Sequence, residues 1–128
     1  MEEKNNPLSP HLQIYKWQIS SLLSITHRIV GVINIIAITI ICFWSLSLLL
    51  GAENYLIINN FFQSFFGKFA AVGLCWTFSF HILNELRHLF WDLGYGFDLK
   101  ISKITGVLAL VGSFVFTVLF YLIGKNIF

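Results

Sequence analysis

Residues 65–92, FFGKFAAVGLCWTFSFHILNELRHLFWD, decide the fold of this chain because they join an apolar stretch to an ionisable one. The first two thirds are almost wholly apolar, and the last third carries His81, Glu85, His88 and Asp92. At about 100° per residue these four positions fall within about 60° of one another, so on a helix they form one stripe roughly 16 Å long. An apolar helix must turn such a stripe toward something other than lipid. We expect the functional site there.

The composition indicates an integral membrane protein. Of the 128 residues, 57% are hydrophobic and 11% are charged, whereas a soluble globular domain has about 25% charged residues. The length allows a single domain, 1–128, and the net charge of +2 is too small and scattered to indicate a nucleic-acid partner. Cys42 and Cys75 lie in apolar runs and are predicted to be small buried hydrophobes. Two thiols cannot hold an iron–sulfur cluster, which needs four ligands.

Three long apolar runs predict an all-α membrane protein with three transmembrane helices, since about 20 apolar residues cross the hydrocarbon layer. The predicted spans are approximately 22–50, 65–92 and 104–124. Ser20 or Ser21 is the candidate N-cap of the first helix. Residues 54–64 mix polar and aromatic side chains and are predicted to form a short loop or interfacial turn. Residues 94–98, GYGFD, are predicted to be a turn that stops the second helix.

The polar, proline-containing residues 1–20 predict an N-terminal segment on the membrane surface. They show neither a secretory signal nor a mitochondrial presequence, so we expect the first helix to be retained and the membrane to be the bacterial cytoplasmic one rather than the mitochondrial inner membrane. Six of the eight basic residues precede the first span or lie between the second and third: Lys4, Lys16, Arg28, Arg87, Lys100 and Lys103. The positive-inside rule therefore predicts a multi-pass chain with a cytoplasmic N-terminus and a periplasmic C-terminus.

His81 is the first candidate for cofactor chemistry. A histidine in an apolar span is costly unless it is paired or ligated, and a neutral imidazole can bind haem iron through one nitrogen. The spacing leaves two interpretations open, a haem ligand and a structural histidine hydrogen-bonded to a neighbouring helix. By the span assignment His27 and His88 lie near the membrane surface, where haem propionates would be. A second axial ligand would then come from another polypeptide.

A second candidate site lies at the start of the first span. Ser24, His27, Arg28 and Gly31 are spaced i, i+3, i+4 and i+7, which places them on one helix face. The planar donor fork of Arg28 suits a carboxylate or a polarised carbonyl, and Ser24 adds a small donor one turn away. The pattern predicts a site for a quinone carbonyl or for haem propionates. The alternative is an interfacial arginine that anchors the helix to lipid phosphate.

Glu85 needs a partner if it is buried. Arg87 points roughly 160° away around the helix, so we expect Glu85 to pair with His88 or with another subunit. The sequence carries no glycine-rich nucleotide loop, cysteine cluster, metal-ligand quartet or nucleophile–base pair. The chain therefore has no soluble active site of its own and cannot perform substrate redox chemistry alone.

Three blocks of the sequence resemble the cytochrome b membrane-anchor subunits of succinate dehydrogenase (respiratory complex II). The blocks are PLSPHLQIY at 7–15, SITHRIVG at 24–31, and His81 together with RHLFWD at 87–92. The resemblance covers nearly the whole chain and implies three spans within a heteromeric helix bundle. Asn6 and Glu85 depart from the family pattern, in which an arginine often precedes the first block and a small residue often stands at position 85. The carboxylate of Glu85 is therefore expected to face a partner chain or water.

The resemblance also implies the site residues and the partners. His81 would be an axial ligand of haem b, with the second ligand supplied by a companion hydrophobic anchor subunit. Ser24 and Arg28 would line the ubiquinone site beside the iron–sulfur subunit, and His27 and His88 would lie close to the haem propionates. Flavin and iron–sulfur clusters would belong to the flavoprotein and iron–sulfur subunits, so this chain would help to pass electrons from succinate to ubiquinone.

Three alternatives remain open at this point. The chain could be the anchor of a fumarate reductase, which runs the same centres in reverse. It could be a small transport subunit that uses the stripe of His81, Glu85 and His88 as a proton path. The other two predicted spans offer too few polar groups for a self-contained path, namely Asn34, Thr39, Ser113 and Thr117. The third alternative is a purely structural anchor without a cofactor.

Overall fold

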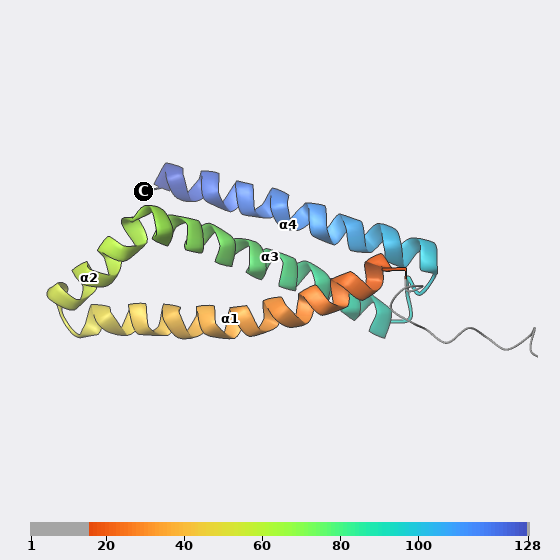
Figure 1. Cartoon of the computed structure of the whole chain (residues 1–128), viewed down its shortest axis with the longest axis horizontal. Helices are drawn as coiled ribbons and strands as arrows, with labels where there is room; N and C mark the ends of the chain where they lie inside the picture. Colours follow the sequence, from red (N-terminus) through yellow and green to blue (C-terminus); the bar gives the residue numbers. More distant parts are fainter. Residues whose placement is uncertain (1–15, 128) are drawn as a thin grey trace, which may run out of the picture.

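The computed structural model describes residues 16–127, with side chains as far as Lys125. This part of the chain forms four α-helices, α1 (Ile19–Leu49), α2 (Ala52–Gln63), α3 (Phe65–Asp92) and α4 (Leu99–Ile127), and contains no strand. Three of them, α1, α3 and α4, are long and apolar enough to cross a membrane. The predicted fold class, an all-α membrane protein with three such helices, is confirmed. Figure 1 shows α3 between α1 and α4, with α2 joining the far end of α1 to α3.

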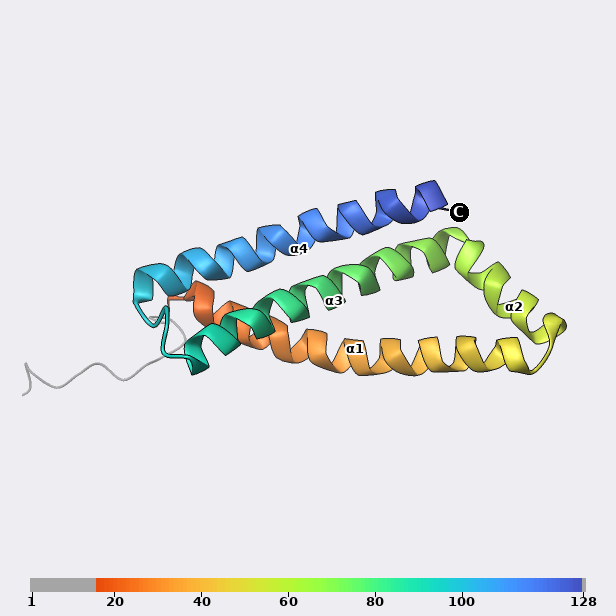
Figure 2. The same ribbon diagram turned by 180° about the vertical axis from the view of Figure 1, so that it is seen from behind.

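The prediction of a loop at 54–64 was wrong, because most of that segment belongs to the 12-residue helix α2. Gly51, at φ 110°, makes the turn out of α1, and Figure 2 shows the helix closing that end of the molecule. No residue of α2 is buried within the chain, and Leu56, Ile57 and Phe61 are exposed. Apolar side chains that face outward from a helix at the end of a bundle suit the interface of a membrane. The sequence did not predict this helix, because its apolar residues do not pack into a core and are mixed with polar ones.

The joint between α2 and α3 depends on one glycine. Ser64 caps α3, and its Oγ accepts a hydrogen bond from the Gly67 amide at 3.1 Å. A Cβ on Gly67 would collide with the Phe61 carbonyl oxygen and lie 2.7 Å from Phe62 Cα. The two helices can meet at this distance only because residue 67 has no side chain.

The end of α3 agrees with the prediction from sequence, and the start of α1 does not. Helix α1 begins at Ile19 with Gln18 in the N-cap position, so the prediction of Ser20 or Ser21 as the cap was wrong. The predicted turn after α3 is confirmed, because Gly94 and Gly96 adopt φ values of 86° and 83°. Helix α4 begins at Leu99, ahead of the uncharged run. The predicted interfacial segment falls mainly on residues 1–15, outside the residues described.

The interior of the bundle is small and rich in polar side chains. The buried apolar residues are Leu23, Val30, Ala37, Phe80 and Ala109, and the buried polar or charged ones are Asn34, Ser47, Thr77, Ser79, Asn84, Arg87, Ser113 and Thr117. The Asn34 side-chain amide donates to the Thr77 carbonyl at 3.4 Å and so joins α1 to α3. Small residues and interhelical hydrogen bonds are typical of packing between membrane helices.

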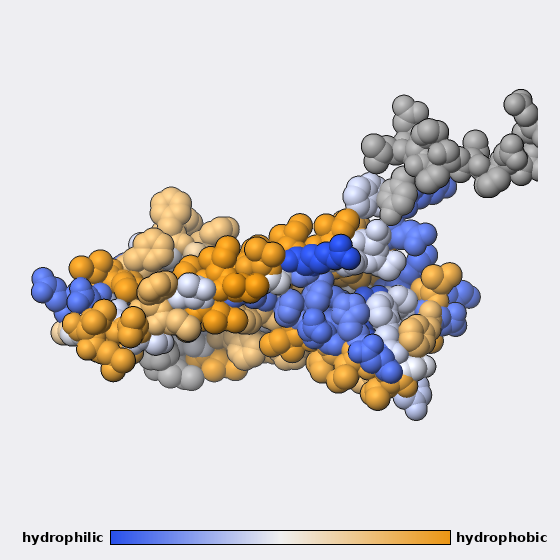
Figure 3. All heavy atoms as spheres, turned by 90° about the horizontal axis from the view of Figure 1, so that it is seen from below, coloured by the Kyte–Doolittle hydropathy of each residue, from blue (hydrophilic) through white to orange (hydrophobic). Residues whose placement is uncertain are grey.

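The outer surface carries the large apolar side chains. Most exposed side chains along α1 and α4 are Ile, Leu, Val or Phe, as expected where lipid or another membrane chain covers them. Cys42 lies on this outer surface, so the prediction that it is buried was wrong, and Cys75 is half-buried. Figure 3 shows hydrophilic side chains gathered toward the end where α1 begins and α3 ends. That end holds the candidate site.

Candidate functional site

Four ionisable side chains from two helices meet near this hydrophilic end, and we call them the His–Glu cluster: His27, His81, Glu85 and His88. The rings of His27 on α1 and His81 on α3 stack, with centroids 4.4 Å apart and planes inclined by 13°. His88 meets His27 edge-on at 5.3 Å. Glu85 places Oε1 3.0 Å from His27 Nε2 and 3.9 Å from His81 Nε2. The ligand atoms of His27, His81 and Glu85 all lie within 4.8 Å of one another.

The packing of α1 on α3 brings the cluster together. Leu23 and Val30 of α1 pack in one apolar group with Phe80 of α3, and this contact fixes the two helices beside each other. Gly31 follows His27 by one turn, and a Cβ at Gly31 would touch His81 Cε1 at 3.5 Å. The backbone of α1 therefore lies directly against the His81 ring. His27 consequently lies closer to His81 than the predicted spans suggested, because sequence spacing within α1 does not fix its register against α3.

The buried nitrogens of the cluster lack complete partners. Within the described chain, His81 Nδ1 is buried without a hydrogen bond, and so is His27 Nε2. His27 Nε2 is close to Glu85 Oε1, but the pair lacks the alignment of a hydrogen bond. Buried polar atoms are rarely left without partners. The cluster therefore holds two buried ring nitrogens to which the described chain supplies no hydrogen bond.

Exposure increases across the cluster from His27 to Glu85. The side chains of His27, His81 and Glu85 are 16%, 32% and 55% exposed. The prediction that Glu85 pairs with His88 or with another subunit missed its contact with His27, which comes from a different helix. More than half of the Glu85 side chain is nevertheless exposed. Asp92, the last member of the predicted stripe, is exposed and lies outside the cluster.

Ser24 and Arg28 lie on the outer side of α1. Both are exposed, and neither forms a hydrogen bond or ion pair with another residue between 16 and 127. Arg28 is next to His27 in sequence, so α1 turns His27 toward α3 and Arg28 outward. Their donors are available to a ligand or to another chain.

Sequence reasoning missed the structural role of Arg87. This buried side chain joins α3 to α4: its Nε donates to Thr105 Oγ1 at 3.2 Å, and Nη2 donates to the Ser102 carbonyl at 3.0 Å and to Ser102 Oγ at 2.9 Å. Its Nη1 is 3.4 Å from Asn84 Oδ1, and the guanidinium lies 4.1 Å from the centre of the Trp91 ring. The sequence did contain a sign of this contact: Ser102 and Thr105 are spaced i, i+3 at the start of the next helix, so their polar groups share one face of it.

The comparison with known families identifies the family of this chain. The sequence model of the succinate dehydrogenase/fumarate reductase transmembrane subunit matches residues 2–120. This chain belongs to that family. The matched residues include the first block of the resemblance, at 7–15, which lies outside the described residues. The other two blocks lie on α1 and α3 and meet in the His–Glu cluster.

Individual relatives of this transmembrane subunit agree with the family match. The succinate dehydrogenase cytochrome b556 subunit of Rickettsia felis is 44% identical over 115 residues, covering 90% of both chains. That of Paracoccus denitrificans is 32% identical over 115 residues, covering 90% of this chain and 88% of its own. The cytochrome b560 subunit of Reclinomonas americana is 37% identical over 128 residues, covering 93% and 86%. The resemblance to succinate dehydrogenase cytochrome b membrane subunits is confirmed.

Proposed function

We propose that this succinate dehydrogenase membrane subunit binds haem b through His81, jointly with a second hydrophobic anchor subunit, and contributes Ser24 and Arg28 to the ubiquinone-reduction site. One observation carries the proposal: His81 is packed against His27 and Glu85, yet its side chain stays 32% exposed, so the ring can be reached from outside the chain. The relatives are named as cytochrome b556 and b560 subunits, which supports haem binding by this chain.

The residues of the cluster fit a haem group. His81 is one-third exposed, so its ring can be reached from outside the chain, and a ligating imidazole needs one nitrogen for iron and a hydrogen bond at the other. His27 and His88 offer ring N–H groups to propionates. Glu85 Oε1 lies 3.9 Å from His81 Nε2, so its carboxylate would lie beside a group held at that nitrogen. Haem would supply reversible one-electron chemistry at this position.

Ser24 and Arg28 fit the polar end of a quinone. The Arg28 guanidinium can donate to a ring oxygen and stabilise the negative charge that develops there on reduction. Ser24, one turn away, can donate a further hydrogen bond. Arginine stays protonated in proteins, so the protons taken up by the reduced ring must come from water or a neighbouring chain. Arg28 would therefore orient and polarise the quinone rather than transfer protons to it.

The proposal also places the chain within a complex. A second anchor subunit would cover the exposed side of the cluster, and the iron–sulfur subunit would dock at the cytoplasmic end, with the flavoprotein beyond it. The membrane would be the bacterial inner membrane, with the N-terminus cytoplasmic and the C-terminus periplasmic. The family includes fumarate reductases, but the similar relatives named above are all subunits of succinate dehydrogenase, which favours the succinate-to-quinone direction.

The spectrum of the assembled complex tests the ligand assignment. The wild-type complex should show a b-type band in its reduced-minus-oxidised absorbance spectrum, and His81→Ala should abolish the band because the axial nitrogen is removed. Asp92→Ala is the control: it removes an ionisable side chain from the same helix but outside the cluster, and should leave the band in place. A band that persists in His81→Ala at equal complex yield would contradict the assignment.

A further inference from the structure

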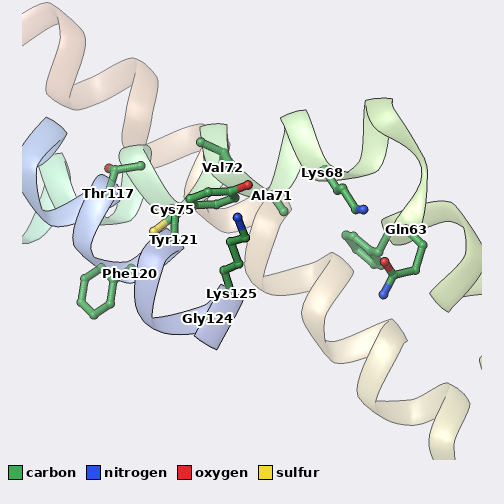
Figure 4. A pocket seen from close by; sticks show the side chains of 11 residues that line it. Gln63, Lys68, Ala71, Val72, Cys75, Thr117, Phe120, Tyr121, Gly124 and Lys125 are labelled. Atoms are coloured by element: carbon green, nitrogen blue, oxygen red, sulfur yellow. The ribbon is translucent and has the colours of Figure 1, made fainter. Parts of the chain in front are cut away.

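A hollow of about 690 Å³ lies at the end of the bundle remote from the His–Glu cluster. It is bounded by the last turn of α2, the first turns of α3 and the last turns of α4. Figure 4 shows Lys125 reaching toward Tyr121, with Lys68 and Gln63 at the other side of the hollow. The proposed haem and quinone sites use none of these residues.

The walls of this hollow are positively charged. Lys68 and Lys125 both line it, and no acidic residue does. Between residues 16 and 125 neither lysine forms an ion pair, because the ion pairs of this region join Glu85 to histidines. Gln63 and Tyr121 add uncharged donors to the same lining. The polar part of the hollow is therefore complementary to an anion.

Below the lysines the walls become apolar. On α3, Lys68 is followed at i+3, i+4 and i+7 by Ala71, Val72 and Cys75, which line the hollow from one helix face. On α4, Phe120 and Thr117 continue the wall inward from Lys125. The hollow therefore runs from charged ends into the apolar length of the two helices.

The position of the lysines matches the depth of lipid headgroups. Lys68 is in the first turn of α3 and Lys125 is in the last full turn of α4, so both lie where spanning helices leave the hydrocarbon layer. Lysines at such positions place their ammonium groups at the headgroup level and their aliphatic stems along apolar surface. A free anion would leave the apolar walls uncovered, and a neutral lipid would leave both ammonium groups without a counterion.

We propose that this hollow binds one anionic phospholipid, with its phosphate held by Lys68 and Lys125 and one acyl chain packed along α3 and α4. The inference stands apart from the proposed haem and quinone sites, which lie at the other end of the bundle. Each lysine near an anionic headgroup is worth about fivefold in affinity, so the pair should favour an anionic over a zwitterionic lipid by about 25-fold.

Native mass spectrometry of the assembled, delipidated complex tests the proposal. The complex is titrated with phosphatidylglycerol or with phosphatidylcholine of the same acyl chains, and bound lipids are counted. The wild type should bind one phosphatidylglycerol about 25-fold more tightly than phosphatidylcholine. The double variant Lys68→Gln/Lys125→Gln should lose this preference. The control Lys100→Gln/Lys103→Gln, which removes two charges from the other end of α4, should keep it.

Alkylation of Cys75 supplies an independent measurement on the same hollow. In a Cys42→Ser background, phosphatidylglycerol should slow the reaction of Cys75 with N-ethylmaleimide in the delipidated complex, and inorganic phosphate should not. A lipid preference that survives in Lys68→Gln/Lys125→Gln overturns the proposal. So does equal protection by inorganic phosphate, which would indicate a simple anion site. Complete protection of Cys75 before lipid is added would mean that another polypeptide fills the hollow, and would overturn it as well.

Discussion

At the scale of single residues, Glu85 is the one acidic side chain in contact with the imidazoles of the cluster among the described residues. Its Oε1 approaches the Nε2 atoms of both His27 and His81, so one carboxylate oxygen lies between the rings' polar edges. A negative charge there favours any positive charge placed on or beside the imidazoles. Arg28 is next to His27 in sequence but is turned outward and exposed, and in the proposed quinone site its positive charge would act on a quinone oxygen.

Replacing Glu85 with glutamine should raise the midpoint potential of haem b. In the proposed haem site the carboxylate beside His81 would stabilise the more positive oxidised iron, and an amide of similar shape would remove that charge; we expect an upward shift on the order of tens of millivolts. Potentiometric titration of the purified complex measures it. Glu53→Gln, in the first turn of α2, is the control and should leave the potential unchanged. A downward or absent shift in Glu85→Gln would show that the carboxylate does not act on the haem.

Replacing Arg28 with alanine should impair quinone reduction by about 100-fold, the usual cost of losing a donor to a developing oxyanion. Succinate oxidation with an artificial acceptor should continue at the wild-type rate, because that reaction does not require the quinone site. Lys103→Ala removes an exposed cation from α4 and serves as the control. Unchanged quinone reduction in Arg28→Ala would remove this residue from the site.

The residues of the site were predicted from the sequence, but their mutual contacts were not. Helical periodicity within one segment placed His81, Glu85 and His88 on a common face, and the structure confirms it. The contact between Glu85 and His27 depends on how α1 is rotated and shifted against α3. Packing of Leu23 and Val30 on Phe80 sets that rotation, and no spacing within a single helix reports it.

At the scale of helices, the junction of α2 and α3 leaves no space for a side chain at residue 67. The Ser64 cap and the bare backbone of Gly67 let α3 begin directly beneath the last turn of α2. The same junction forms part of the lysine-lined hollow, since Gln63 and Lys68 stand on either side of it. Its geometry therefore positions one wall of the proposed lipid site.

Replacing Gly67 with alanine should destabilise the complex by about 1–3 kcal/mol, because the new Cβ would collide with the backbone of Phe61 and Phe62. The thermal midpoint of the purified complex should fall. Gly73→Ala on the same helix is the matched control: a Cβ there meets no atom within 4 Å, and alanine favours a helix by up to about 1 kcal/mol over glycine. Equal midpoints for the two variants would contradict this account of the junction.

The three long helices were predictable because lipid imposes a length and an apolar composition on each one. The turn at 94–98 was predictable because its glycines permit positive φ. Helix α2 was not predictable in the same way, since its apolar side chains face outward and produce no core pattern. The buried contacts of Arg87 were also missed, because its partners Ser102 and Thr105 belong to another helix.

At the scale of the whole molecule, charge is distributed unequally between the two ends. Within the described residues, Lys16, Arg28, Arg87, Lys100 and Lys103 belong to the end where α1 begins and α4 starts, and Lys68 and Lys125 belong to the other. Figures 1 and 2 show these two ends separated by the full length of the bundle. Because basic residues are enriched on the cytoplasmic side of membrane proteins, this asymmetry supports the proposed orientation in the membrane.

Reporter fusions should reveal this orientation. Alkaline phosphatase fused to the C-terminus should be active and a fluorescent protein there should be dark, because phosphatase matures outside the cytoplasm and the fluorescent protein inside it. The same two reporters inserted in the 94–98 turn should give the opposite pattern and serve as the internal control. An active phosphatase in the turn, together with a fluorescent C-terminus, would reverse the proposed topology.

The buried guanidinium of Arg87 has a consequence for how the chain enters the bilayer during synthesis. Helix α3 is the least apolar of the three spans, and a buried guanidinium without hydrogen-bond acceptors costs free energy. Its hydroxyl and carbonyl acceptors on Ser102 and Thr105 are translated only after α3 is complete. Helix α3 should therefore be more stably inserted when α4 is present, and a released chain that ends before Leu99 should insert α3 less completely than the full chain.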